Sequence, residues 1–123
     1  MKVLLHHIYE YKKGLRNLVL HTLSVSYRQE AERVLENQNI QYIIQEVSEN
    51  KMNIFFGAED CIHIIKSFGN KPLYRFTPKE DFILGIMLGY DQIRQCKRYL
   101  QKIDKESVSE LLLAIPYHDM HED

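Results

Sequence analysis

Hydrophobic and polar positions follow two different periods along this chain, and each change of period marks a new element. Three short apolar runs, at residues 17–23, 40–47 and 52–56, are rich in β-branched and aromatic side chains and predict strands. Around them, apolar residues recur every three or four positions, which predicts helices. The predicted order is helix, strand, helix, strand, strand, and then three more helices.

The first fifteen residues fit both periods. Leu4 and Ile8 share one helix face, whereas alternate residues of the same segment nearly fit a strand. We favour a short helix that ends at Gly14, because Lys12, Lys13 and a following glycine are typical of a helix C-terminus.

The segment from Thr77 to Tyr99 has the clearest helical period. Thr77, Pro78 and Glu80 are the residues that a capping box and a first helical turn require. The pattern therefore predicts one long helix that packs on the sheet, followed by a last helix that begins at Asp104.

One face of this predicted long helix is apolar and is bordered by two glycines. Gly85 and Gly89 would each cost about 1 kcal/mol relative to alanine inside a helix. We therefore expect another element to approach the backbone closely there. The apolar stripe consists of Phe82, Ile83, Ile86, Met87, Tyr90, Ile93 and Leu100.

The fold class is predicted to be α+β, with a three-stranded mixed sheet that is apolar on both faces. The middle β-α-β-β-α unit is ferredoxin-like without its fourth strand. A right-handed crossover makes the first two strands parallel, and either the first or the third strand is central. If the third is central, Asn17–Leu23 is an open edge that no charge or proline protects. A homodimer through this edge or through helix faces is then expected.

Length and charge limit the classes of protein to consider. The chain has 123 residues, which predicts one domain over residues 1–116 and a flexible tail over 117–123. Sixteen basic and seventeen acidic residues argue against a nucleic-acid or membrane-surface partner. No apolar run approaches the roughly 20 residues that span a bilayer, and the start does not resemble a signal peptide. A cytoplasmic location is expected.

No metal or cofactor is predicted. His6 and His7 are adjacent and would point about 100° apart on a helix. They have no ligand spacing of a known metal site. The tail residues His118 and His121 have a spacing that could bind nickel or zinc loosely, but on a chain terminus we interpret them as solvated surface. The two cysteines form no disulfide framework, and we interpret Cys61, like its counterpart at position 96, as a packing residue.

Two groups of residues are candidates for contact with a ligand or partner. The first is a basic cluster near an aromatic side chain, which would suit an acidic partner. The second is a cleft in which the end of the long helix meets the N-terminal histidines. The basic group is Tyr11, Lys12, Lys13 and Arg16, and the cleft group is Tyr90, Asp91, Gln95 and Cys96 with His6 and His7.

Three segments, HHIYEYKKGLRNLVLHTL, NIFFG and FTPKEDFILGIMLGYDQIRQCKRYL, resemble an uncharacterised bacterial family of about this length. The resemblance runs from near residue 3 to near residue 100, and LGYDQIRQC is its most specific motif. It implies a small α+β homodimer with three strands, about five helices and an unknown function. It also implies an association with flavodoxins, as a neighbour or an appended domain, and it supplies no catalytic residues.

Two functions from different classes follow. The first is a non-enzymatic protein-binding or accessory domain that acts as a homodimer, with a flavodoxin-like electron carrier as one partner. The second is a small-molecule or catalytic site in the cleft near Tyr90 and Cys96.

Overall fold

The computed structural model describes the backbone of residues 1–114 and the side chains of residues 1–106. The predicted tail over 117–123, with His118 and His121, lies outside the described residues.

The described chain is an α+β fold, as predicted. Two short 3-10 turns, η1 (Val25–Tyr27) and η2 (Leu73–Arg75), join some of its elements. The strands are β1 (Leu18–Ser24), β2 (Gln41–Glu46) and β3 (Lys51–Gly57). The helices are α1 (Lys2–Lys12), α2 (Arg28–Asn37), α3 (Glu59–Ser67), α4 (Pro78–Met87) and α5 (Gln92–Ala114).

The N-terminal segment is a helix, which resolves the ambiguity of its sequence. The helix α1 ends at Lys12, and Gly14 follows in the left-handed region with φ 77°. The N–H of Gly14 donates to Tyr11 O and the N–H of Leu15 donates to Glu10 O. This pair of bonds is a Schellman motif, so the glycine ends the helix as expected.

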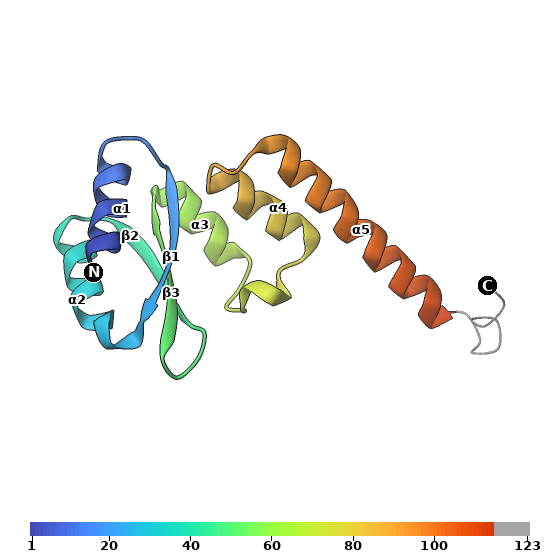
Figure 1. The fold of residues 1–123 in the computed structure, drawn as a ribbon, viewed down its shortest axis with the longest axis horizontal. Coiled ribbons are helices and arrows are strands. Elements are labelled where there is room, and N and C mark those ends of the chain that lie inside the picture. Colours follow the sequence, from blue (N-terminus) through green and yellow to red (C-terminus); the bar gives the residue numbers. More distant parts are fainter. Residues whose placement is uncertain (115–123) are drawn as a thin grey trace.

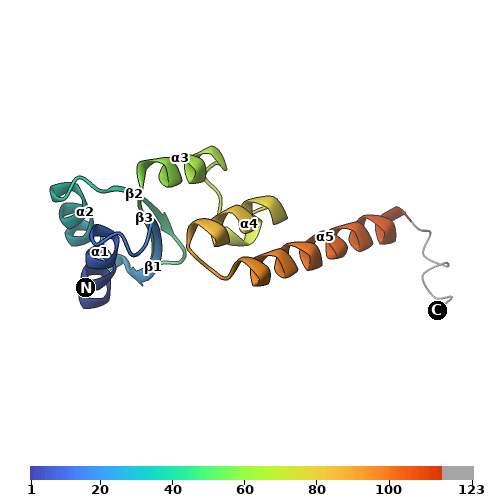
Figure 2. The same ribbon diagram turned by 90° about the horizontal axis from the view of Figure 1, so that it is seen from above.

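The sheet has the order β1-β3-β2, with β3 antiparallel to both neighbours. The strands β1 and β2 run in the same direction, as expected, but β3 lies between them. Both hydrogen-bonded strand pairs are therefore antiparallel, and the sheet is not mixed. The strand order matches a ferredoxin-like unit without its fourth strand, although α3 lies on the opposite face from α2 (Figures 1 and 2). The strand β1 is an edge.

The first face of the sheet is closed by α1 and α2 (Figure 2). The side chains of Val19, Ile54 and Phe56 project from this face, and Leu4 and Leu35 of the helices pack on them. All five are buried without measurable exposure. This face therefore carries the larger and better sealed core.

The second face is covered by α3 and α4. Leu18 and Phe55 project from the sheet on this side, where Ile65 of α3 and Leu84 and Leu88 of α4 contact them. The prediction that both sheet faces are apolar and covered is therefore confirmed.

The predicted single helix from Thr77 to Tyr99 is wrong: α4 ends at Met87, and α5 begins at Gln92. The predicted start of a last helix at Asp104 is also wrong, because α5 continues through that residue. An aspartate can cap a helix or lie on its exposed side, and here it does the latter. The predicted number of helices still holds for the described residues, because the break between the last two helices lies between Met87 and Gln92 rather than before Asp104.

The helix α5 leaves the body of the protein. Figures 1 and 2 both show it extending beyond α4, away from the sheet. The long C-terminal helix therefore does not pack on the sheet; α4 does. None of the helices in the described part of the chain is both long and apolar enough to cross a membrane.

Candidate functional site

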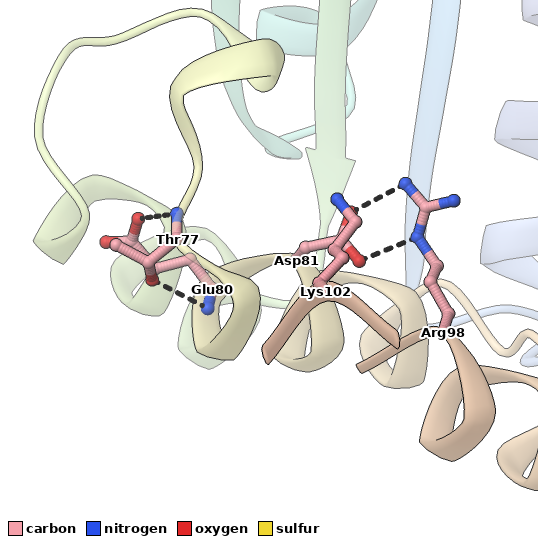
Figure 3. Close-up of polar contacts among 5 residues, drawn as sticks. All are labelled: Thr77, Glu80, Asp81, Arg98 and Lys102. Atoms are coloured by element: carbon pink, nitrogen blue, oxygen red, sulfur yellow. Dashed lines mark hydrogen bonds and ion pairs between the residues drawn. The ribbon is translucent and has the colours of Figure 1, made fainter. Parts of the chain in front are cut away.

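The hairpin formed by α4 and α5 begins with the predicted capping box. Glu80 N–H donates to Thr77 Oγ1 at 3.2 Å, and Thr77 N–H donates to Glu80 Oε1 at 2.9 Å (Figure 3). Lys71 forms an ion pair with the same carboxylate. The hydrogen bond from Lys71 lowers the pKa of Glu80, so this carboxylate stays charged at the helix start.

The turn between the two helices explains why the predicted long helix is divided. Gly89 has φ 81°, and its N–H donates to Ile86 O while the N–H of Tyr90 donates to Gly85 O. This Schellman motif satisfies two terminal carbonyls of α4. Asp91 then starts α5, because its Oδ2 accepts a 2.9 Å hydrogen bond from the backbone N–H of Arg94. Asp91 thus acts as a helix cap.

An ion cluster joins the two helices. Arg98 donates to both oxygens of Asp81, from Nε at 2.8 Å and from Nη2 at 3.1 Å, and Lys102 Nζ lies 3.3 Å from the same carboxylate (Figure 3). Burial raises the pKa of Asp81, but the bonds from Arg98 and Lys102 outweigh burial and lower it overall. The cluster thus contains two cations and one carboxylate.

A cavity of about 400 Å³ lies beside this cluster, between β1 and the α4–α5 hairpin. Leu20 of β1 forms part of its wall, together with Leu84 and Leu88 of α4. Tyr90 and Gln95, two residues of the predicted cleft, also line it.

Gly85 lies where Gln95 of α5 crosses α4. A Cβ atom on Gly85 would lie 2.0 Å from Gln95 Oε1, so the glycine permits this contact. The expected close approach therefore exists at Gly85, although a side chain of α5 makes it. At Gly89 no atom lies within 4 Å of such a Cβ, and the glycine is required there by its positive φ.

Most of the predicted apolar stripe faces solvent. Ile93 and Leu100 are 62% and 59% exposed, and Ile86 and Ile83 are also exposed. We call this surface the hairpin platform. The rings of Phe82 and Tyr99, whose centroids are 5.5 Å apart, join its two halves. The expectation that the stripe packs on the sheet is wrong, because Leu84 and Leu88 form the buried side of α4. The platform consists of Phe82, Ile83, Ile86, Tyr90, Ile93, Cys96, Tyr99, Leu100 and Ile103.

The N-terminal candidates form a separate cluster at the first face. His7 Nδ1 lies 3.0 Å from Glu10 Oε1 and 3.0 Å from Arg16 Nη1, and its ring is 5.2 Å from that of His21. The hydrogen bond from His7 lowers the pKa of Glu10, and burial lowers the pKa of His21. His6 is mostly exposed and lies 3.8 Å from Glu10.

The side chains of the predicted basic cluster already contact other groups of the protein. Arg16 is turned toward Glu10, whereas Lys12 Nζ donates to Gln38 O at 3.3 Å and Lys13 lies over the ring of Tyr9. The remaining member of this predicted group, Tyr11, packs edge-on against a core phenylalanine.

The structure thus separates what the sequence grouped. Tyr90 and Gln95 line the cavity, Asp91 caps a helix and Cys96 lies on the platform. The histidines belong to α1 and do not line that cavity. The described residues contain no cluster of three His, Cys, Asp or Glu side chains that could hold a metal ion. Burial raises the pKa of the Cys61 thiol, as a packing role requires.

Sequence reasoning missed the cations of the cavity, Arg98 and Lys102. Their spacing of four residues places them on one helix face, and Asp81 lies in the first turn of the preceding helix. These spacings indicate a charged cluster only if residues 78–114 are known to form a helical hairpin.

The model of one protein family matches residues 2–102, which is most of the chain. That family is described as a protein of unknown function (DUF2023). This chain belongs to it. No curated protein matches the chain significantly. Membership confirms the resemblance to an uncharacterised family and assigns no activity, so function must be argued from the surfaces themselves.

Proposed function

We propose that this protein is a non-enzymatic protein-binding domain that acts as a homodimer, and that the hairpin platform is the contact between its two copies. The observation that carries the proposal is the exposure of large apolar side chains, Ile93 and Leu100 above all, on a helix that leaves the body. Isolated helices are marginal in water, and packing of an apolar face supplies most of their stability. A partner on the platform would supply that packing.

The apolar residues of α5 have a spacing that suits another helix. Ile93, Cys96, Leu100 and Ile103 follow one another at intervals of three, four and three residues. This is the a and d spacing of helices that pack side by side. The opposite side of α5 is polar, so one side alone is suited to a partner.

Charge favours a second copy of this chain in antiparallel orientation. Lys97 and Asp104 lie seven residues apart on one flank of the apolar strip, and both are exposed. A two-fold axis near Leu100 would bring Lys97 of each copy opposite Asp104 of the other. In a parallel pair this flank would face the other flank of the partner helix, so this charge pair would not form. In the part of the chain whose side chains are described, neither residue lies within ion-pair distance of an opposite charge.

The edge of β1 is the other surface on which a second copy would fit. Ala58 N–H donates to Asn17 O and Val25 N–H donates to Asn50 O, so the odd-numbered residues of β1 bond to β3. Leu20 and Thr22 therefore direct their N–H groups outward. We favour the platform because it offers exposed apolar side chains, whereas the strand edge offers chiefly backbone groups.

The dimer is tested by the dependence of the melting temperature on protein concentration. Dimerisation stabilises the folded state by mass action, so the wild-type Tm is expected to rise by about 2–4 °C per tenfold concentration. Ile93→Lys should abolish this rise, because it would bury a charge in the contact. Val3→Lys is the matched control, since Val3 lies on α1 and is 56% exposed, and it should keep the rise.

A second variant separates the two contact surfaces. Thr22→Pro removes one outward N–H from β1 and the side-chain hydrogen bond from Thr22 Oγ1 to Asn53 Oδ1, and it leaves the backbone bonds to β3 in place. It is expected to leave the concentration dependence unchanged. Loss of the dependence in Thr22→Pro, with its retention in Ile93→Lys, would assign the dimer to the strand edge and overturn the platform.

An acidic flavodoxin-like electron carrier remains the proposed partner of the dimer. The exposed basic residues that we assign to this contact are Lys12 at the end of α1, Lys13 at its C-cap and Arg94 on the polar side of α5. Arg16 is neutralised by Glu10. Binding to a flavodoxin should weaken several-fold between low and physiological salt, because exposed charges are screened. Titration at both salt concentrations tests it, and binding insensitive to salt would exclude this charge-based contact.

A further inference from the structure

The cavity beside Arg98 shares only Tyr90 with the platform and has the composition of a ligand site. Its volume of about 400 Å³ falls within the range of small-molecule pockets. Leu20, Leu84 and Leu88 give it an apolar wall, because this part of the second core is not closed by a further helix. A ligand that occupies it must present an apolar body to these side chains.

The charged wall of the cavity has a surplus of positive charge. Arg98 uses Nε and Nη2 for Asp81, and Lys102 uses one direction of its ammonium group. A guanidinium carries five N–H donors and an ammonium three, so donors remain on both residues. Both line the cavity, and with Asp81 ionised the three groups together carry one net positive charge.

The remaining polar and aromatic groups lie around the same space. The carboxamide of Gln95 is held against Gly85 and forms no hydrogen bond within residues 1–106. Tyr74, which is 87% exposed, and Tyr90 line the cavity and offer aromatic faces. A flat ring could stack on such faces, since offset and edge-on aromatic pairs are favourable.

We propose that this cavity binds a small aromatic carboxylate. The carboxylate would accept hydrogen bonds from Arg98 and Lys102, and the ring would lie against Leu20, Leu84 and Leu88. A single negative charge matches the surplus, whereas a phosphate dianion would leave the cavity with one net negative charge. A cationic ligand is disfavoured by the same surplus. This site goes beyond the proposed dimer and does not depend on it.

The test uses 2-naphthoate, with neutral 2-naphthamide and ring-free acetate as matched probes. The protein contains no tryptophan, so the fluorescence anisotropy of the naphthyl probes can be followed directly. Methyl resonances of Leu20 and Leu88 report whether binding occurs in the cavity. We expect saturable binding of 2-naphthoate near about 1 mM, which is typical of a fragment of this size. The amide and acetate should bind at least about tenfold more weakly.

Variants assign the binding to the charged wall. Lys102→Gln should weaken the binding of 2-naphthoate about tenfold and leave the affinity for 2-naphthamide unchanged. The control is Lys105→Gln, because Lys105 is an exposed lysine of the same helix outside the cavity, and it should change neither affinity. Ile93→Lys, which removes the proposed dimer contact, should still bind the probe. Equal affinity for acid and amide, no saturable shift at Leu20 and Leu88, or no effect of Lys102→Gln would each overturn the site while leaving the dimer proposal intact.

Discussion

The two faces of the sheet are closed to different degrees. On the first face, α1 and α2 cover a core in which Leu4, Leu35 and Phe56 have no measurable exposure. On the second face, α3 and α4 leave a cavity beside Leu20, and α5 extends away (Figure 1). The first face stabilises the fold, and the second places partly covered apolar surface next to charge. We therefore propose the second face for the dimer contact and the ligand site.

A local cause explains the difference. Gly89 turns the chain after only ten residues of α4, so the apolar positions that follow cannot continue along the sheet. They lie instead on α5, where Arg98 reaches back to Asp81 and fixes the hairpin. The same turn creates the cavity on one side and the platform on the other.

The largest expected effect comes from equal truncations on the two faces. Leu35→Ala should lower the free energy of unfolding by about 3–4 kcal/mol, because the closed first core cannot collapse fully around the void. Leu84→Ala should cost about 2 kcal/mol, since Leu84 already borders an open cavity. Denaturant unfolding measures both values. Equal losses would show that the second face is as well sealed as the first.

The next effect tests the orientation of the platform contact. Lys97→Glu should weaken the dimer by about 1–2 kcal/mol, because it places like charges opposite each other at two symmetric positions. Asp104→Lys alone should do the same, and the double variant should restore the wild-type dissociation constant. Sedimentation velocity at several concentrations gives these constants. A double variant as weak as the sum of the two single variants would rule out the antiparallel pair.

The smallest effect is a difference in pH dependence between the faces. Burial holds the pKa of His21 below its usual 6.5, so the unfolded chain binds more protons and first-face stability falls as the pH drops below that value. The pKa of Asp81 is also lowered, from 3.8, so its contribution is full above that value and is lost only at lower pH. In thermal melts from pH 7 to 3, His21→Asn should reduce the loss of stability below pH 6.5, and Asp81→Asn should reduce the loss at the acidic end. Glu10 and Glu80, whose pKa values are also lowered, should keep the rest of the acidic loss. Control melts of Glu49→Gln, an exposed hairpin residue, should retain both losses.

Much of the fold follows from the sequence alone. Alternating apolar runs gave three strands within one or two residues of their bounds, and Gly14 and the Thr77 capping box marked helix ends by local rules. Helix caps are readable because the atoms that satisfy them lie within five residues of one another. The strand order required long-range pairing, and the sequence left two orders open.

The candidate site was less predictable, for a physical reason. A helical period shows that one side of a helix is apolar but not what lies against it, so the stripe through Ile86 and Leu100 was assigned to the sheet when it faces solvent. Gly89 is compatible with a helix interior and with a helix end, and only the Schellman bonds distinguish the two. Once that turn was missed, Arg98 and Asp81 could not be recognised as neighbours.

The mass of the wild-type protein in solution tests the central claim most directly. The protomer has a mass of 14.7 kDa. Sedimentation equilibrium at micromolar concentration should give twice that mass for the wild type and for Val3→Lys, and a single protomer for Ile93→Lys. A wild-type protein that remains at the protomer mass throughout the micromolar range would contradict the account, because the platform would then be exposed without a second copy to cover it.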